Sequence, residues 1–328
     1  MTLTSVTVSA RMARFSVSPW FGLARVPALI AGALFFSASA SAVEVRFVQV
    51  APGIYAHIGD KGARTALNEG LNANIGLIVA AGGAILIDSG ATFSSARDIH
   101  TAVKRITPLP VKWVINTGGQ DHRWLGNGYF AAQGAELIAH TSARADMQAR
   151  GGDQLQALRQ TLGNQADGTT PMLPTRLIEG RDAVLELGGL KLEVRHRGAA
   201  HTPGDLMVRV PAVNTVFSGD VVYVERMLGV IPVSNTRTWL EAFDALVEWN
   251  PAIIVPGHGA VTTIATARRD TRDYLAALRA HMKKAVDDGT DVSAAIKSFP
   301  LGEFAQLLVA AEIHPGNASR TYLEMERE

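Results

Sequence analysis

Short stretches in which hydrophobic and polar residues alternate recur along the chain, separated by glycine, proline or polar turns. Alternation with a period of two is typical of half-buried strands. The stretches predicted as strands are residues 45–50, 54–58, 74–79, 84–88, 111–116, 136–139, 183–187, 191–197, 206–210, 215–218 and 252–255. Hydrophobic residues three or four positions apart predict helices. These helices cover residues 94–106, 124–133, 148–172, 238–249 and 265–287, with two or three short helices in the last forty residues.

The first 42 residues follow a different pattern. They contain arginines but no acidic residue before Glu44, and an apolar run over residues 26–36 precedes small residues that end at Ala42. This layout predicts a secretory signal peptide over residues 1–42, cut after Ala42. The alternative is an uncut membrane anchor, but the apolar run is short for a bilayer. We therefore expect a periplasmic or secreted protein without stable membrane association after cleavage.

Composition narrows the possible partners and ligands. The net charge is only +1, and no dense block of lysine and arginine is present, so nothing indicates a nucleic-acid partner. The chain has no cysteine, which excludes disulfide bonds and thiolate metal ligands. Any metal would have to be held by histidine and carboxylate side chains.

Such side chains follow predicted strands in a fixed order. They are Asp121-His122, His201, Asp220 and His258, and glycine lies close to most of them. This succession resembles the metallo-β-lactamase-fold superfamily, whose loop usually reads His-x-His-x-Asp-His and binds two metals. Among its members the whole-chain pattern is most similar to exported proteins associated with periplasmic quinoproteins and sulfur oxidation.

The resemblance implies an α/β (α+β) fold of the four-layered αβ/βα sandwich type. It covers about residues 46 to 280. We accordingly expect a metallo-β-lactamase-like domain over residues 43–285 and a C-terminal helical extension over residues 286–328.

The resemblance also implies one metal site in place of two. Asp121, His122, Asp220 and His258 match the second site, so we expect one zinc per chain, with another divalent metal as the alternative. In the first site Gly119 stands at the second histidine position and Thr117 at the first, or else the loop is one residue short.

Four more residues have candidate roles around that metal. His201 matches the remaining histidine of the first site and is expected to act with Asp220 as a hydrogen-bond partner of the bound water or as a general base. Asp88 would either support the metal loop or begin a turn. Arg123 or Gln120 could occupy the volume of the absent histidines, where either could hold a substrate anion.

Two functional hypotheses remain. The first is an exported metal-dependent hydrolase acting on a small molecule with an ester, thioester or lactam-like bond. The second is a non-catalytic binding protein that keeps the fold and lost the first metal site. Fold alone does not choose between them.

Overall fold

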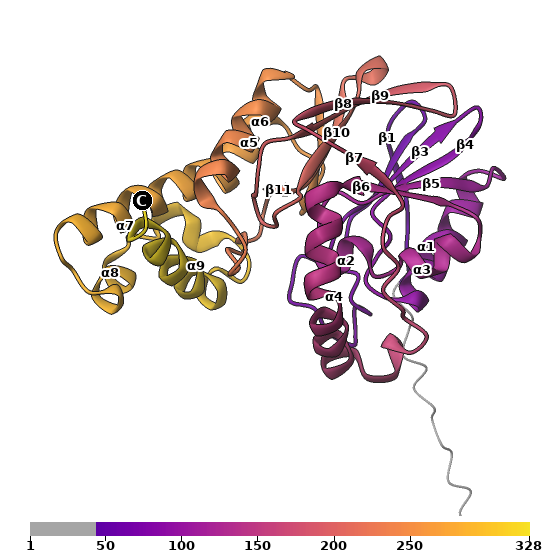
Figure 1. Cartoon of the computed structure of the whole chain (residues 1–328). Helices are drawn as coiled ribbons and strands as arrows, with labels where there is room; N and C mark the ends of the chain where they lie inside the picture. The colour runs from indigo at the N-terminus through magenta and orange to yellow at the C-terminus, as the bar shows by residue number, and fades with distance from the viewer. Residues whose placement is uncertain (1–43) are drawn as a thin grey trace, which may run out of the picture. The chain divides into compact units, whose positions relative to one another are not determined.

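The computed structural model describes residues 44–328, which form two β-sheets accompanied by helices (Figure 1). The expected signal peptide lies outside the described residues. Among residues 44–328, no helix has the length and apolar character needed to cross a membrane.

The first sheet contains seven strands in chain order, antiparallel up to the β3–β4 pair and parallel from β4 to β7. Its strands are β1 (Val48–Ala51), β2 (Ile54–His57), β3 (Ile75–Ala80), β4 (Gly83–Ile87), β5 (Val111–Ile115), β6 (Glu136–His140) and β7 (Arg176–Ile178). The helices between them are α1 (Phe93–Ile106), α2 (Asp121–Trp124), α3 (Asn127–Ala132) and α4 (Thr141–Leu162).

The second sheet has five strands in the order β12-β11-β10-β9-β8. They are β8 (Asp182–Leu187), β9 (Leu190–His196), β10 (Leu206–Val210), β11 (Thr215–Tyr223) and β12 (Ile253–His258). The chain crosses from β11 to β12 through α5 (Thr236–Glu248), and these two strands are parallel. The carboxyl ends of parallel strands meet at one edge, where loops gather polar groups.

Alternating side chains divide the molecule into layers. In β4, Ile85 and Ile87 pack against strand residues of the second sheet such as Phe217. Their neighbour Leu86 packs on the other face, in the same cluster as Ile99 of α1. The outer face of the second sheet has its own cluster, which includes α5. Two sheets packed face to face between helical layers confirm the predicted αβ/βα sandwich.

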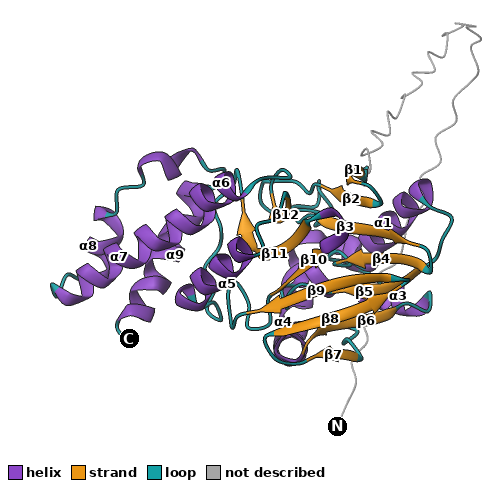
Figure 2. Cartoon of the chain, turned by 90° about the horizontal axis from the view of Figure 1, so that it is seen from above, coloured by secondary structure: helices purple, strands orange, loops and turns teal. Residues whose placement is uncertain are grey.

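The C-terminal helices share one core with α5. They are α6 (Ile264–Ala267), a π-helical turn over Arg268–Asp273, α7 (Tyr274–Asp287), α8 (Val292–Ser298) and α9 (Ala310–Met325). Leu278 of α7 and Tyr322 of α9 lie in the same cluster as Trp239 of α5. Figure 2 shows α7, α8 and α9 grouped next to α5. The boundary expected at residue 286 stays a prediction.

Several element boundaries differ from the expected ones. The helix expected over 148–172, for example, ends at Leu162. Two other differences bear on the site. The helix expected over 124–133 is broken near Gly126, whose backbone lies so close to Ser89 that a Cβ atom there would overlap its carbonyl oxygen. Strand β11 continues past residue 218 to Tyr223, so Asp220 lies within a strand. Helix α4 begins at Thr141, because the His140 side chain accepts a hydrogen bond from the Ser142 N–H.

Candidate active site

Strand ends and one short helix bring the candidate residues together. Asp88 follows β4, and the loop after β5 leads into α2, which carries His122 and Arg123. Asp220 lies in β11, and His258 ends the parallel strand β12. The two sheets therefore both contribute to the site.

Three of the predicted ligands form a buried cluster. His122, Asp220 and His258 each offer one ligand atom, and these atoms lie within 4.8 Å of one another. The Nε2 atom of His122 is 3.2 Å from Asp220 Oδ2, and that of His258 is 3.3 Å from Asp220 Oδ1. Burial would raise the pKa of Asp220, but Arg123 and the two histidines hold that pKa well below its usual value.

Hydrogen bonds on the far side of the ring fix the tautomer of His258. Its Nδ1 lies 2.6 Å from the backbone oxygen of Asn72. A carbonyl oxygen can only accept, so Nδ1 carries the proton and neutral His258 turns a bare Nε2 towards Asp220. Burial lowers the pKa of His258 well below its usual value, which favours this neutral form. His258 Nε2 and Asp220 Oδ1 are then two acceptors that lie 3.3 Å apart, an arrangement that a cation between them would stabilise.

The spacing of the cluster is compatible with one metal ion. Zinc lies about 2.0–2.2 Å from imidazole nitrogen and carboxylate oxygen, so tetrahedral ligands are separated by about 3.3 Å. The separations of 3.2 and 3.3 Å are close to that value, but they end on different oxygens of Asp220, Oδ2 for His122 and Oδ1 for His258. Three protein ligands with one open position are typical of a catalytic site.

The side chain of Asp121 lies outside this cluster, contrary to its expected role as a ligand. Its carboxylate forms a two-pronged ion pair with Arg64, whose Nη2 is 2.6 Å from Asp121 Oδ1. Burial would raise the pKa of Asp121, but Arg64 and His122 lower it. Asp121 Oδ1 also lies 3.4 Å from His122 Nδ1, where a carboxylate can orient a metal-binding imidazole from behind.

The Arg123 side chain lies beside Asp220, where its contacts are with other residues of the protein. Its Nε lies 3.1 Å from Asp220 Oδ2, and an Nη2 hydrogen bond reaches Asp220 Oδ1. The remaining N–H groups bind Asp88 Oδ2 at 3.0 Å and the backbone oxygens of Asn74 and Gly257 at 3.2 and 3.0 Å. All five donors are occupied and the residue is 1% exposed, so none is left for a substrate anion.

The pair that faces Asp220 is therefore His122–Arg123, one residue later than expected. With this offset, Gly118 and Gln120 stand at the earlier motif positions assigned to Thr117 and Gly119. Thr117 instead donates to Asp88 through its backbone N–H at 2.7 Å and its hydroxyl at 2.8 Å. This is the loop-supporting role foreseen for Asp88.

His201 lies on a small cavity with the cluster. The cavity has a volume of about 130 Å³ and is lined by Asn72, Gln120, His122, His201, Tyr223, Arg226, Gly229, His258 and Ile313. The Nδ1 of His201 lies 2.7 Å from the Gly229 oxygen, so the ring donates there and its Nε2 is unprotonated in the neutral form. Burial lowers the pKa of His201, although Asp220 opposes this.

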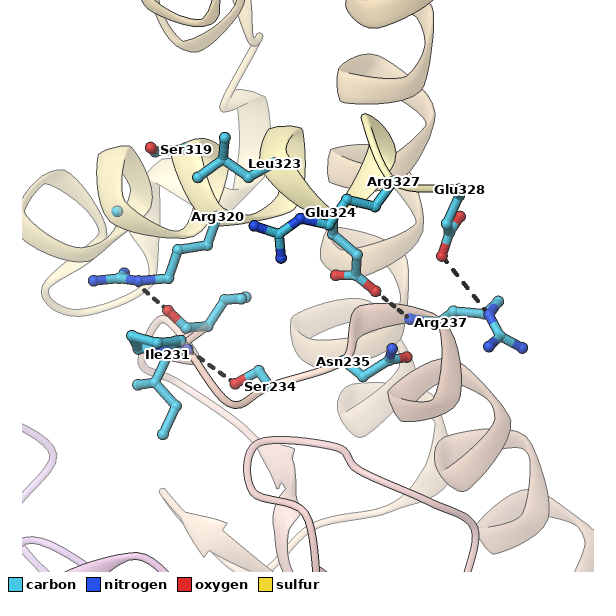
Figure 3. A pocket seen from close by; sticks show the side chains of 13 residues that line it. Ile231, Ser234, Asn235, Arg237, Ser319, Arg320, Leu323, Glu324, Arg327 and Glu328 are labelled. Atoms are coloured by element: carbon cyan, nitrogen blue, oxygen red, sulfur yellow. Dashed lines mark hydrogen bonds and ion pairs between the residues drawn. The ribbon is translucent and has the colours of Figure 1, made fainter. Parts of the chain in front are cut away.

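A larger cavity of about 700 Å³ lies between residues 230–237 and α9 (Figure 3). Two of its arginines have partners in the protein: Arg320 donates to Val230 O at 2.9 Å, and Arg237 pairs with Glu241 and Glu328. The same segment supports the site from behind, because Ser234 Oγ donates to His201 O at 2.7 Å. Two of the three candidate ligands, His122 and His258, line the smaller cavity.

Comparison with known proteins places the chain in a family. A family model described as the metallo-beta-lactamase superfamily matches residues 68–258, more than half of the chain. The chain therefore belongs to the metallo-β-lactamase superfamily. Uncharacterized proteins of Mycobacterium tuberculosis and Mycobacterium bovis are similar, each 26% identical over 197 residues that cover 57% of this chain and 84% of the relative.

Solved structures show the same fold. The stereoselective inverting sec-alkylsulfatase Pisa1 from Pseudomonas sp. is 17% identical with a TM-score of 0.69, and the match covers 85% of this chain. This chain spans 50% of the length of that protein. A metallo-beta-lactamase from Pontibacter korlensis is 18% identical with a TM-score of 0.55, covering 68% of this chain and 95% of the lactamase.

The sequence interpretation missed Arg64, Asn72 and Arg226 as neighbours of the site. Arg226 carried the clearest signal, because a charged pair interrupts the apolar stretch that runs from residue 221 to residue 230. Ile313 had no such signal, since it reaches the cavity from α9, far along the chain.

Proposed function

We propose that this chain is an exported hydrolase that binds one divalent metal ion, zinc by its ligand types, through His122, Asp220 and His258. Membership of the superfamily supports a metal-dependent hydrolase-like function. The observation that carries the proposal is the buried ligand cluster, in which tautomer and spacing leave room for one cation. The proposed bond is an ester, thioester or lactam-like bond of a small molecule.

Each protein side chain has a distinct part in this proposal. A metal bound there lowers the pKa of bound water to about 7 and polarises the scissile bond. Arg123 holds both oxygens of Asp220, so the carboxylate cannot rotate. His201 directs its unprotonated Nε2 to the cavity and accepts the proton that the attacking water loses. Because burial favours neutral His201, the base remains available in mildly acidic solution.

Metal analysis of three variants tests the proposal. We expect one equivalent per chain in the wild type after dialysis. His258→Ala should abolish metal binding, whereas His201→Ala should keep most of the metal and lose about 10²–10⁴-fold in kcat, the usual contribution of a general base. His281→Ala, at a histidine of α7 that hydrogen-bonds within the C-terminal helices, is the matched control. Two equivalents in the wild type would refute the single-site proposal.

A non-catalytic binding protein is the second candidate, and the saturated Arg123 favours it. That side chain supplies a fixed positive charge beside Asp220, so the site can persist without a metal. Zero equivalents of metal together with no turnover would select this candidate. The assay panel should include sulfate esters and β-lactams, because the neighbours of known structure are an alkylsulfatase and a lactamase.

A further inference from the structure

Arg226 is a buried cation without a carboxylate partner. It is 8% exposed and lines the cavity with His122, His201 and His258. Among residues 44–328, no carboxylate lies within 4.0 Å of its guanidinium, and its Nε has no hydrogen-bond acceptor. Burial lowers the pKa of Arg226, but arginine stays protonated in proteins.

Within residues 44–328, the guanidinium of Arg226 has one close side-chain contact, with His258, and this contact does not satisfy its donors. Arg226 Nη1 lies 3.3 Å from His258 Nδ1. That nitrogen already donates its proton to Asn72 O at 2.6 Å and has no lone pair left in the ring plane. Arg226 and His258 thus present two donors to each other, and the buried Nε of Arg226 lacks an acceptor.

The backbone holds Arg226 in this position at a cost. Glu225 has a φ of 62°, in the left-handed region that residues other than glycine seldom adopt. The flanking backbone is tied to Leu308, with Leu308 N bonded to Glu225 O at 3.0 Å and Met227 N bonded to Leu308 O at 2.9 Å. The C-terminal region therefore helps to build the cavity, where Ile313 forms part of the wall.

We propose that Arg226 is the anchor of an oxyanion subsite, and that the substrate carries a compact oxyanionic group such as a carboxylate, sulfate or phosphate next to the reacting bond. This inference rests on the proposed function, because it places the subsite in the same cavity. A buried unpaired charge is costly, and a ligand oxyanion supplies the missing acceptors as charge-assisted hydrogen bonds.

The size and the other groups of the cavity limit what can enter. The cavity is small, about 130 Å³, and it is not enclosed, so we expect it to take the charged group of a substrate while the rest of the molecule extends outside. Gln120 Oε1 and Asn72 Oδ1 are buried acceptors without partners. These two oxygens can accept hydrogen bonds from the two protons of a hydrolytic water, while Arg226 donates to the anion.

Calorimetric titration of the metal-loaded full chain with sulfate, phosphate and acetate tests the subsite directly. Arg226→Gln should weaken binding of the preferred anion about tenfold or more, and Arg226→Lys should weaken it less because the charge remains. Arg209→Gln is the matched control. Arg209, on β10, also has a buried Nε without a partner, but it pairs with Glu193 of β9 and does not line the cavity. Unchanged affinity in Arg226→Gln would overturn the proposal.

Repeating the titration on metal-free protein separates the arginine from the metal as the anion's partner. The loss of anion affinity in Arg226→Gln should persist in the metal-free protein. A loss seen only with metal bound would overturn the assignment to Arg226. Comparison of sulfate, phosphate and acetate also indicates which charged group the substrate carries, because the anion that binds most tightly resembles that group.

A pair of esters separates this proposal from the proposed function. For an aryl ester with a charged oxyanionic group and its neutral analogue, Arg226→Gln should lower kcat/KM about tenfold or more for the charged ester only. An equal loss for both esters would contradict the subsite. If the wild type hydrolyses neither ester but the titration still shows Arg226-dependent binding, the hydrolase proposal fails and the subsite stands.

Discussion

Two arginines are buried among the described residues, and they have opposite surroundings. Arg123 is 1% exposed, and all five of its N–H groups have acceptors, including the carboxylates of Asp88 and Asp220. Arg226 is 8% exposed, and its Nε has no acceptor. Both touch the same cluster, Arg123 through Asp220 and Arg226 through His258.

The difference teaches how to interpret a buried charge. Arg123 ties the end of β4, the α2 helix, β11 and the end of β12 together, so it serves the framework. Arg226 makes no comparable bonds within the described residues, so its charge is left for something that enters the cavity.

Removal of Arg123 should have the largest effect. Arg123→Met leaves Asp88 and Asp220 buried without their cation, which typically costs about 3–5 kcal/mol. Urea denaturation of the metal-free protein at pH 7 measures the loss in unfolding free energy. A change below about 1 kcal/mol would mean that the arginine contributes no more than a surface ion pair.

The same substitution at Arg226 should behave differently. Arg226→Met removes a buried charge that has no carboxylate partner and keeps the volume filled, so the unfolding free energy should stay within about 1 kcal/mol of the wild type or rise. The same urea titration measures it. A loss as large as that of Arg123→Met would show that the two arginines have the same structural role.

The fold was predictable from the sequence because its signals are local. Residues 84–87 are buried on both faces of the sheet, and the continuous apolar run Ala84-Ile85-Leu86-Ile87 indicates this in the sequence. The helix over Phe93–Ile106 begins at the Thr92 cap and carries its apolar residues at helical spacing. Such patterns need no knowledge of distant parts of the chain.

The orientation of the α2 residues was not predictable in the same way. Neighbouring residues in a helical turn point about 100° apart, so a choice between Asp121 and Arg123 as the partner of Asp220 depends on where the helix starts. The ion pair of Asp121 with Arg64 settles it, and Arg64 is separated from Asp121 by 57 positions. Likewise, the strand predicted over residues 215–218 continues to Tyr223, so Gly219 and Asp220 lie inside β11.

Restoring histidines at the positions first assigned to the lost site should fail. In Thr117→His/Gly119→His, a Cβ atom at residue 119 would overlap the carboxylate of Asp146. Residue 117 would also lose the hydrogen bond that the Thr117 hydroxyl donates to Asp88. We expect no second metal in a titration followed by elemental analysis, and a lower Tm. Gln120→His is the comparison, because residue 120 lines the cavity and its imidazole can strengthen binding of the single metal. Two equivalents in the double variant would show that Arg123 does not block the second place.

The last prediction concerns a buried carboxylate without an arginine. Burial, reinforced by Asp220, raises the pKa of Asp205 to about 8, against hydrogen bonds from Thr202. In the unfolded chain the pKa of the Asp205 carboxyl is about 3.9. Between about pH 4 and pH 8 the folded protein therefore binds more protons than the unfolded chain, and its unfolding free energy falls as pH rises.

Unlike Arg226, Asp205 can avoid a buried charge by binding a proton. Asp205→Asn imitates that neutral form, so its Tm should fall less from pH 5 to pH 8 than the Tm of the wild type. Thermal unfolding curves of both proteins at unit pH steps measure this, and parallel pH dependences would show that Asp205 is ionised in the folded protein.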